Sequence, residues 1–322
     1  MAPERVVVIG GTGFIGRHLV ARLATEAVAV AVVSPERPTH ALPKGVSWCA
    51  GDVRDARSLH AALVGATTVY HLASAHGLES QPRALFVAIN VEGTRHVAEA
   101  AHTADVSHLI FASTARVYGS RDANPSEATT PAPANHYAET KLAAERVLEE
   151  WRYGRSGRRL TIVRPCVVIG PGAHATGGAF LRMIVAPGYA IEGDGRERKA
   201  LAHVENLAAF LAFAGCRTAS PWLFNYADQP DFELREIVAV AREAAGVRSA
   251  PHRERETGWM RSVGRALSRR SAAAVGAGMT RTFDVTRVRD AGFVAPVPLR
   301  DAIANTARSE FGWLRLIDQR RA

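Results

Sequence analysis

The chain has 322 residues, 47% of them apolar, which permits one large or two moderate folded domains around a buried core. The formal net charge of +9 would suit nucleic-acid binding, but the basic residues are scattered and no nucleic-acid motif is present, so we expect no such partner. No stretch approaches the roughly 20 apolar residues that a membrane helix needs, and the N-terminus lacks the pattern of a signal peptide.

Strand-like and helix-like segments alternate along the first half of the chain. Short apolar runs at 5–9, 28–33, 46–50, 69–73, 108–113 and 160–163 predict strands. Helical patterns stand between them at 14–24, 58–63, 85–101 and 137–151. Alternation at this spacing is typical of parallel strands joined by right-handed helical crossovers. The prediction is an α/β fold of Rossmann type, a doubly wound parallel sheet.

The pattern changes after residue 165. Glycine-rich loops at 170–172 and 177–178 precede a helical run at 201–213 and one more strand at 222–226. We therefore expect residues 1–165 to form a nucleotide-binding domain and residues 166–322 mainly a smaller, mixed substrate lobe. The chain should return to the sheet near 201–226.

A glycine turn follows the first strand, with the spacing Gly10-x-x-Gly13-x-x-Gly16. Gly10 permits the tight turn, Gly13 lets backbone approach a pyrophosphate, and Gly16 lets the next helix pack closely on the strand. The phosphates would lie at the helix N-terminus, at Phe14 and Ile15, where free N–H groups attract anions. The context predicts a dinucleotide site.

The end of the second strand bears on the choice of cofactor. An acidic residue there would bind the ribose hydroxyls of NAD, but the chain has Ser34, with Arg37 close behind. Serine and arginine suit a 2′-phosphate, so NADP is favoured over NAD, although Glu36 could turn inward and select NAD. Asp52 and Val53, after the third strand, are expected at the adenine edge.

Tyr137 and Lys141 stand four residues apart, on one face of a predicted helix. A lysine ammonium near a phenol lowers its pKa towards working pH, which lets the tyrosine exchange a proton with a carbinol or carbonyl oxygen. The chain has three lysines, Lys44, Lys141 and Lys199, and arginine at its other positively charged positions. A lysine next to Tyr137 is therefore unusual for this chain, which favours a functional role. A hydroxyl from the preceding strand should complete the site, and Thr114 is preferred over Ser113.

Together these motifs resemble the extended short-chain dehydrogenase/reductases, the NAD(P)-dependent epimerase/dehydratase group. The resemblance covers nearly the whole chain and includes five further motifs: His71-Leu72-Ala73-Ser74, Asn90-Val91-Glu92-Gly93-Thr94, Val117-Tyr118-Gly119, Arg164-Pro165 with Gly170-Pro171-Gly172, and His203-Val204-Glu205-Asn206-Leu207. It implies a catalytic Thr114, Tyr137 and Lys141. It also implies that Tyr137 and Lys141 contact the cofactor, together with Leu72, Ala73, Ser74, Asn90 and Pro165.

The resemblance leaves the substrate open. Lys199 matches a phosphate-binding arginine of nucleotide-sugar enzymes, and Arg281 is a second candidate clamp on a diphosphate. Val167 replaces an asparagine that many of these enzymes carry, which instead favours reductases or dehydrogenases of apolar alcohols, of hydroxysteroid or dihydroflavonol type. Ser113 and Arg116 complete the predicted substrate contacts, and Arg116 stands where sugar dehydratases place an acidic pair.

We therefore expect an NAD(P)-dependent nucleotide-sugar epimerase or 4-ketoreductase. The alternatives are an NADPH-dependent apolar-alcohol enzyme and, more remotely, a non-catalytic nucleotide sensor. A homodimer is expected through the helices at 85–101 and 137–151. The basic segment 252–281 could lie weakly on an anionic membrane surface or pack on the core. Three widely spaced cysteines argue against disulfides or a zinc site, so we expect a cytoplasmic protein without metal.

Overall fold

The computed structural model describes residues 5–26, 29–76, 81–173, 176–217, 222–249, 252–253 and 282–311. Its centre is a seven-stranded sheet in the order β11-β6-β5-β4-β1-β2-β3, and every neighbouring pair in it is parallel. The strands are β1 (Arg5–Ile9), β2 (Ala29–Ser34), β3 (Ser47–Ala50), β4 (Thr68–His71), β5 (His108–Ala112), β6 (Arg159–Pro165) and β11 (Leu223–Tyr226). The order reverses between β1 and β4, so a crevice is expected at the carboxyl ends of these two strands.

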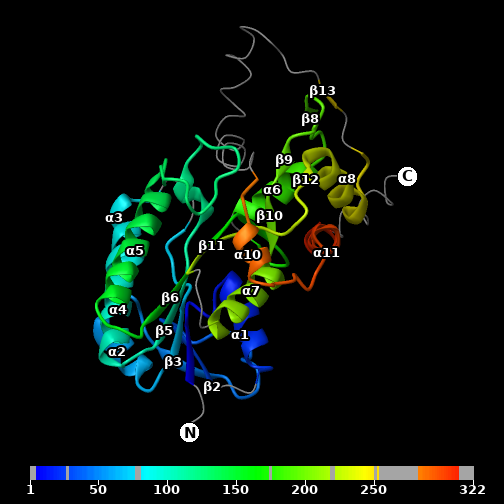
Figure 1. Ribbon diagram of the computed structural model, residues 1–322. Coiled ribbons are helices and arrows are strands. Elements are labelled where there is room, and N and C mark those ends of the chain that lie inside the picture. Colours follow the sequence, from blue (N-terminus) through cyan, green and yellow to red (C-terminus); the bar gives the residue numbers. More distant parts are fainter. Residues whose placement is uncertain are drawn as a thin grey trace.

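Helices cover both faces of the sheet (Figure 1). One face packs against α2 (Ala56–Leu63), α4 (Gly93–Thr103) and α5 (His136–Tyr153), whose buried residues share one apolar cluster with β1, β4 and β5. The other face packs against α1 (Phe14–Leu23), α7 (Val204–Cys216) and α10 (Thr286–Asp290). Because both faces are covered, the central strands are continuous apolar runs rather than alternating ones.

A second lobe has its own apolar core. The helices α6 (Thr176–Val185), α8 (Leu234–Ala245) and α11 (Leu299–Phe311) bury a cluster that includes Ile169 and Leu201. Three pairs of short strands frame it among the described residues, with β7 (Val167–Ile169) beside β10 (Leu201–His203), β9 (Arg198–Lys199) beside β12 (Phe232–Glu233), and β8 (Ile191–Glu192) beside β13 (His252–Arg253). In Figure 1 this lobe lies beyond the carboxyl ends of the sheet strands.

The predicted α/β sheet is confirmed, and β11 is the predicted return strand. Two predicted helices were wrong in detail. The run at 201–213 begins as strand β10, because Leu201 to His203 pair in register with β7, and only then continues as α7. The segment 85–101 is three pieces: α3 (Arg83–Phe86), a π-helical turn (Val87–Glu92) and α4. No helix of the described residues is long and apolar enough to cross a membrane.

Candidate active site

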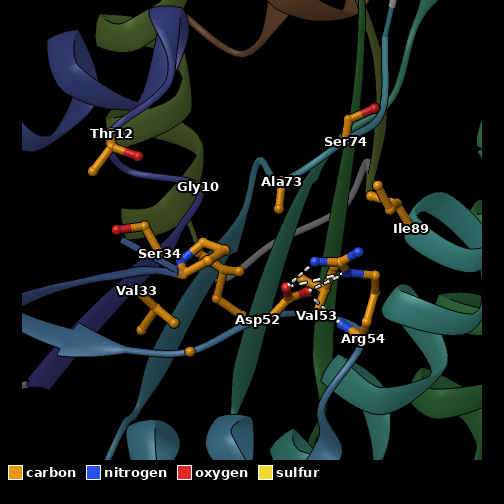
Figure 2. Close-up of a pocket in the computed structure, with 13 residues that line it drawn as sticks. Gly10, Thr12, Val33, Ser34, Asp52, Val53, Arg54, Ala73, Ser74 and Ile89 are labelled. Atoms are coloured by element: carbon orange, nitrogen blue, oxygen red, sulfur yellow. Dashed lines mark hydrogen bonds and ion pairs between the residues drawn. The ribbon is translucent and has the colours of Figure 1, made fainter. Parts of the chain in front are cut away.

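The glycine turn forms the floor of a cavity of about 270 Å³ at the carboxyl ends of β1, β2, β3 and β4 (Figure 2). Gly10 has φ +80°, and a Cβ there would lie 2.6 Å from the backbone nitrogen of Ala73. A Cβ on Gly16 would lie 2.2 Å from the carbonyl oxygen of Gly10. Gly13 caps α1 without a side-chain hydrogen bond, so the N–H groups of the first turn, from Phe14 on, remain available to an anion. The turn therefore has the shape of a pyrophosphate cradle.

Ser34 lines the cavity on the side where an adenosine ribose would lie, and it is hydrogen-bonded to Trp48 on the next strand. The Ser34 hydroxyl donates to the carbonyl of Glu36 at 2.7 Å and accepts from the Trp48 indole at 3.1 Å, and the residue is buried. The Arg37 guanidinium lies 5.8 Å from the centre of the Trp48 ring. Sequence reasoning missed Trp48, whose contact with Ser34 depends on the pairing of β2 with β3.

Asp52 and Arg54 form the opposite wall, as the dashed lines of Figure 2 show. Two nitrogens of the Arg54 guanidinium bind the Asp52 carboxylate at 2.6–3.1 Å, and these hydrogen bonds lower the pKa of Asp52. Val53 is buried between them and also lines the cavity. Asp52 thus lines the cavity with an arginine partner that the sequence pattern did not indicate, and its place at the adenine edge stays a prediction.

Asn90 supports the loop after β4 from behind. Its side-chain oxygen accepts from the backbone N–H of Ala75 at 2.8 Å and from the Ser74 hydroxyl at 3.1 Å. Its amide group donates to the Ala75 carbonyl and to Thr140 on α5. Asn90 lies in the π-helical turn, a form often found at functional sites. It therefore shapes the wall at Ser74, and its predicted contact with the cofactor stays a prediction.

Tyr137 and Thr114 meet next to Ser74. The Tyr137 hydroxyl is hydrogen-bonded by Thr114 and by Ser74. Thr114 also accepts from the backbone N–H of Arg116 at 3.3 Å, which leaves its own hydrogen free to donate to the phenol oxygen. Burial raises the pKa of Tyr137, while Arg116 and the two hydroxyls oppose that rise. The preference for Thr114 over Ser113 agrees with this geometry, because the Ser113 hydroxyl instead donates to Glu145.

Lys141 is buried under the same site, one helical turn beyond Tyr137. Its Nζ lies 4.0 Å from the centre of the Phe111 ring, and burial lowers its pKa to about 7. We expected Lys141 to lower the pKa of Tyr137, but the cation that does so in the structure is Arg116. The difference arises because Lys141 packs against Phe111, a neighbour that helical spacing does not show.

The remaining predicted residues fall into two groups. Leu72, Ala73 and Pro165 stand at the carboxyl ends of β4 and β6, and Ala73 lines the cavity itself. Val167 and Lys199 lie in the lobe, where Val167 packs on the apolar core. Lys199 is buried on β9 opposite Phe232, and burial lowers its pKa. Arg281 and most of segment 252–281 lie outside the described residues.

The chain is similar to known proteins of one enzyme family. Residues 6–221 match the NAD dependent epimerase/dehydratase family. N-acetyl-alpha-D-glucosaminyl-diphospho-ditrans,octacis-undecaprenol 4-epimerase of Escherichia coli O157:H7 is 31% identical over 96% of each chain. Human sterol-4-alpha-carboxylate 3-dehydrogenase, decarboxylating, is 34% identical, over 52% of this chain and 45% of its own.

Solved structures agree. MoeE5 in complex with UDP-glucose and NAD is 27% identical, with a TM-score of 0.73 over 98% of this chain and 99% of its own. UDP-glucose 4-epimerase from Thermotoga maritima, with UDP-glucose, has a TM-score of 0.75 at 20% identity, over 95% and 98% of the two chains, and so shows the shared fold. The resemblance inferred from the sequence motifs is confirmed.

Proposed function

This chain belongs to the NAD dependent epimerase/dehydratase family, and we propose that it is the 4-epimerase of a sugar carried on a diphosphate. The observation that carries the proposal is the hydrogen-bonded cluster of Tyr137, Thr114 and Ser74 beside the dinucleotide cavity. Similarity to an epimerase over almost the entire length of both chains supports the reaction class.

Tyr137 is the acid and base of the proposed reaction. Its phenolate accepts the proton of the sugar hydroxyl as the carbinol carbon is oxidised, and returns it when the ketone is reduced on the opposite face. Thr114 stabilises the phenolate by donating a hydrogen bond, and Arg116 does so by its charge. Bound NAD would accept the hydride and give it back. Gly10, Gly13 and Gly16 would hold its pyrophosphate.

We propose NAD rather than NADP as the cofactor. The hydroxyl of Ser34, on which the NADP prediction rested, is buried and already bonded to Glu36 and Trp48, so it has little capacity for a 2′-phosphate. The family is described as NAD dependent, and the related MoeE5 structure holds NAD. Titration of the purified protein with each dinucleotide, followed by tryptophan fluorescence, should give tighter binding of NAD. Tighter binding of NADP would restore the original prediction and point to Arg37.

The diphosphate is the common element of the substrates of the relatives. The E. coli enzyme is named for a sugar on undecaprenyl diphosphate, and MoeE5 was solved with UDP-glucose. Lys199 is our candidate cation for that diphosphate, since its buried ammonium needs an anionic partner. Arg281 stays a predicted second clamp. We favour an epimerase over a 4-ketoreductase, because the full-length relative is an epimerase.

A turnover assay with two carriers tests the proposal. The NAD-loaded protein is incubated with UDP-N-acetylglucosamine and, separately, with N-acetylglucosamine on a short polyprenyl diphosphate, and the 4-epimer is measured by NMR. Turnover of either supports the proposal, and the better substrate identifies the carrier. Tyr137→Phe should reduce kcat by roughly 10²–10⁴-fold, the usual contribution of a general acid or base. Full turnover by this variant would remove Tyr137 from the mechanism.

An apolar-alcohol dehydrogenase is the second candidate. Val167 presents an apolar side chain at the start of β7, and the human sterol enzyme is similar over half of this chain. Reduction of NAD by a 3-hydroxysteroid, with no turnover of either sugar diphosphate, would favour this function over ours. The same panel tests the remote possibility of a non-catalytic sensor, which would bind NAD and turn over nothing.

Assembly and location stay predictions. A homodimer through α4 and α5 would have to bring charged groups together, because the exposed residues of these helices include Arg95, Glu99 and Arg146. Sedimentation would give the oligomeric state. The predicted membrane-surface contact of 252–281 would be measured by co-sedimentation with anionic vesicles, and cytoplasmic location by cell fractionation.

A further inference from the structure

A buried ion pair lies next to the three predicted catalytic residues, Thr114, Tyr137 and Lys141. Glu145, on α5, and Arg164, near the end of β6, are 2% and 5% exposed in their side chains. The Arg164 Nε lies 3.0 Å from one carboxylate oxygen of Glu145, and a terminal guanidinium nitrogen lies 2.5 Å from the other. This bidentate geometry fixes the carboxylate firmly. A pair so deeply buried rarely adds net stability, because the cost of removing both charges from water offsets their attraction. Its presence therefore suggests a role other than stability.

The pair contacts both the helix and the strand end that carry the predicted catalytic residues. Glu145 stands four residues after Lys141, so the two side chains share a face of α5. The same carboxylate accepts a hydrogen bond from Ser113, the residue before Thr114. One anion thus joins the helix that carries Tyr137 and Lys141 to the strand end that carries Thr114.

Lys141 needs such an anion. Its side chain is buried, its Nζ faces the Phe111 ring, and no carboxylate of the described residues makes a direct ion pair with it. A buried ammonium without compensation loses its proton. Lys141 lowers the pKa of neighbouring His71, on β4, and Glu145 is the titratable group that favours the charged form of Lys141.

Arg164 is in turn held by residues from the far side of the site. Its NH1 donates to the Tyr118 hydroxyl at 2.9 Å, and this hydroxyl donates to the side-chain oxygen of Asn225, on β11, at 2.7 Å. Arg164 therefore cannot swing away from Glu145 without breaking a second buried bond. Arg116, the other cation near the site, acts on Tyr137 instead.

We propose that Glu145 and Arg164 are positioning residues for the proposed reaction: Glu145 supplies the buried negative charge that keeps Lys141 an ammonium ion and holds Ser113 beside Thr114, and Arg164 fixes that carboxylate and moderates its charge. The inference rests on the proposed function for its role in catalysis. The predicted effect of the pair on the pKa of Lys141 is a property of the protein without substrate and can be measured in its absence.

The scarcity of lysine makes a direct measurement possible. The chain has only Lys44, Lys141 and Lys199, so selective ¹³C labelling of lysine gives three side-chain signals. A Lys141→Met variant assigns the signal of Lys141, and exposed Lys44 is an internal reference. Titration of the protein by NMR then reports the pKa of Lys141, which in the native protein should be near 7.

The two members of the pair should shift this pKa in opposite directions. Glu145→Gln removes the anion and leaves Arg164 unpaired, so the pKa of Lys141 should fall by about one unit or more. Arg164→Gln leaves an unpaired carboxylate, so the pKa should rise. Glu149→Gln is the matched control, because Glu149 is one turn further along α5 and does not act on Lys141. It should leave the titration unchanged.

A purely structural role would not give opposite shifts. An unchanged pKa of Lys141 in Glu145→Gln and Arg164→Gln overturns the proposal, as does a shift of the same sign in both. If Glu145→Gln does not fold, Arg164→Gln alone must still raise the pKa, and the double variant, which lacks the anion but leaves no cation unpaired, should titrate below the native value. Absence of sugar turnover would refute the proposed function but would leave these shifts intact.

Discussion

Three buried histidines should make the fold sensitive to mild acid. His71, His108 and His203 are at most 3% exposed. Burial lowers the pKa of His71 to about 3 and those of His108 and His203 to about 4. In the unfolded chain each imidazole would titrate near its ordinary value of 6.5. Below that pH the unfolded state binds protons at these histidines and the folded state does not, so the free energy of unfolding falls as the pH falls.

The size of the effect follows from these pKa values. Each pKa unit corresponds to about 1.4 kcal/mol, so at pH 5 each neutral histidine should cost about 2 kcal/mol of the free energy of unfolding, compared with pH 7. Asp228 works in the opposite direction, because burial raises its pKa to about 6 and the folded state takes up a proton in this range. It should restore about 1 kcal/mol. The net loss is about 4–5 kcal/mol, a large part of the stability of an ordinary domain.

Urea unfolding at pH 7, 6 and 5, followed by tryptophan fluorescence, measures this loss. His203→Leu provides a matched comparison, because neither ring nitrogen of His203 has a hydrogen-bond partner and the substitution breaks no hydrogen bond. The variant should be at least as stable as the native protein at pH 7 and should lose about 2 kcal/mol less on going to pH 5. Equal pH dependence in the two proteins, or a stability independent of pH, would refute the reasoning.

Two further substitutions test the hydrogen bonds of Tyr118 behind the site and the glycine turn of the dinucleotide cavity. Tyr118→Phe removes a hydroxyl that accepts from Arg164 and donates to Asn225, so we expect a loss of about 2–4 kcal/mol in urea unfolding; a loss below about 1 kcal/mol would mean that water replaces the hydroxyl. Gly16→Ala would place a Cβ 2.2 Å from the Gly10 carbonyl and should force α1 away from the turn, weakening NAD binding at least tenfold in a calorimetric titration. Unchanged NAD affinity would show that the close approach at Gly16 is dispensable.

Much of the nucleotide half could be predicted because its signals are local. The strand, glycine turn and helix around Gly10 follow each other within a dozen residues, and each has a conformational reason that the sequence shows directly. Tyr137 and Lys141 likewise need only helical spacing. Thr114 was predicted from its place at the end of the preceding strand, the family resemblance implied the same residue, and the structure brings its hydroxyl to Tyr137.

What sequence could not give depends on contacts between distant segments. The orientation of Ser113 is set by Glu145, 32 residues later, and the surroundings of Lys141 by Phe111, on another strand. The bond between Ser34 and Trp48 requires the register of two parallel strands. Contacts between distant segments produce no periodic pattern in the sequence, so the electrostatics of the site could not be predicted from it.

Isotope retention tests the proposed epimerase reaction most directly. The substrate that the carrier assay selects is prepared with deuterium at sugar carbon 4 and incubated with the NAD-loaded protein in ordinary water. Because the hydride is expected to leave and return within one closed site, the 4-epimer should form with its deuterium retained, and Tyr137→Phe should form almost none. Loss of the deuterium to water, or no epimer from either carrier, would contradict the proposed function.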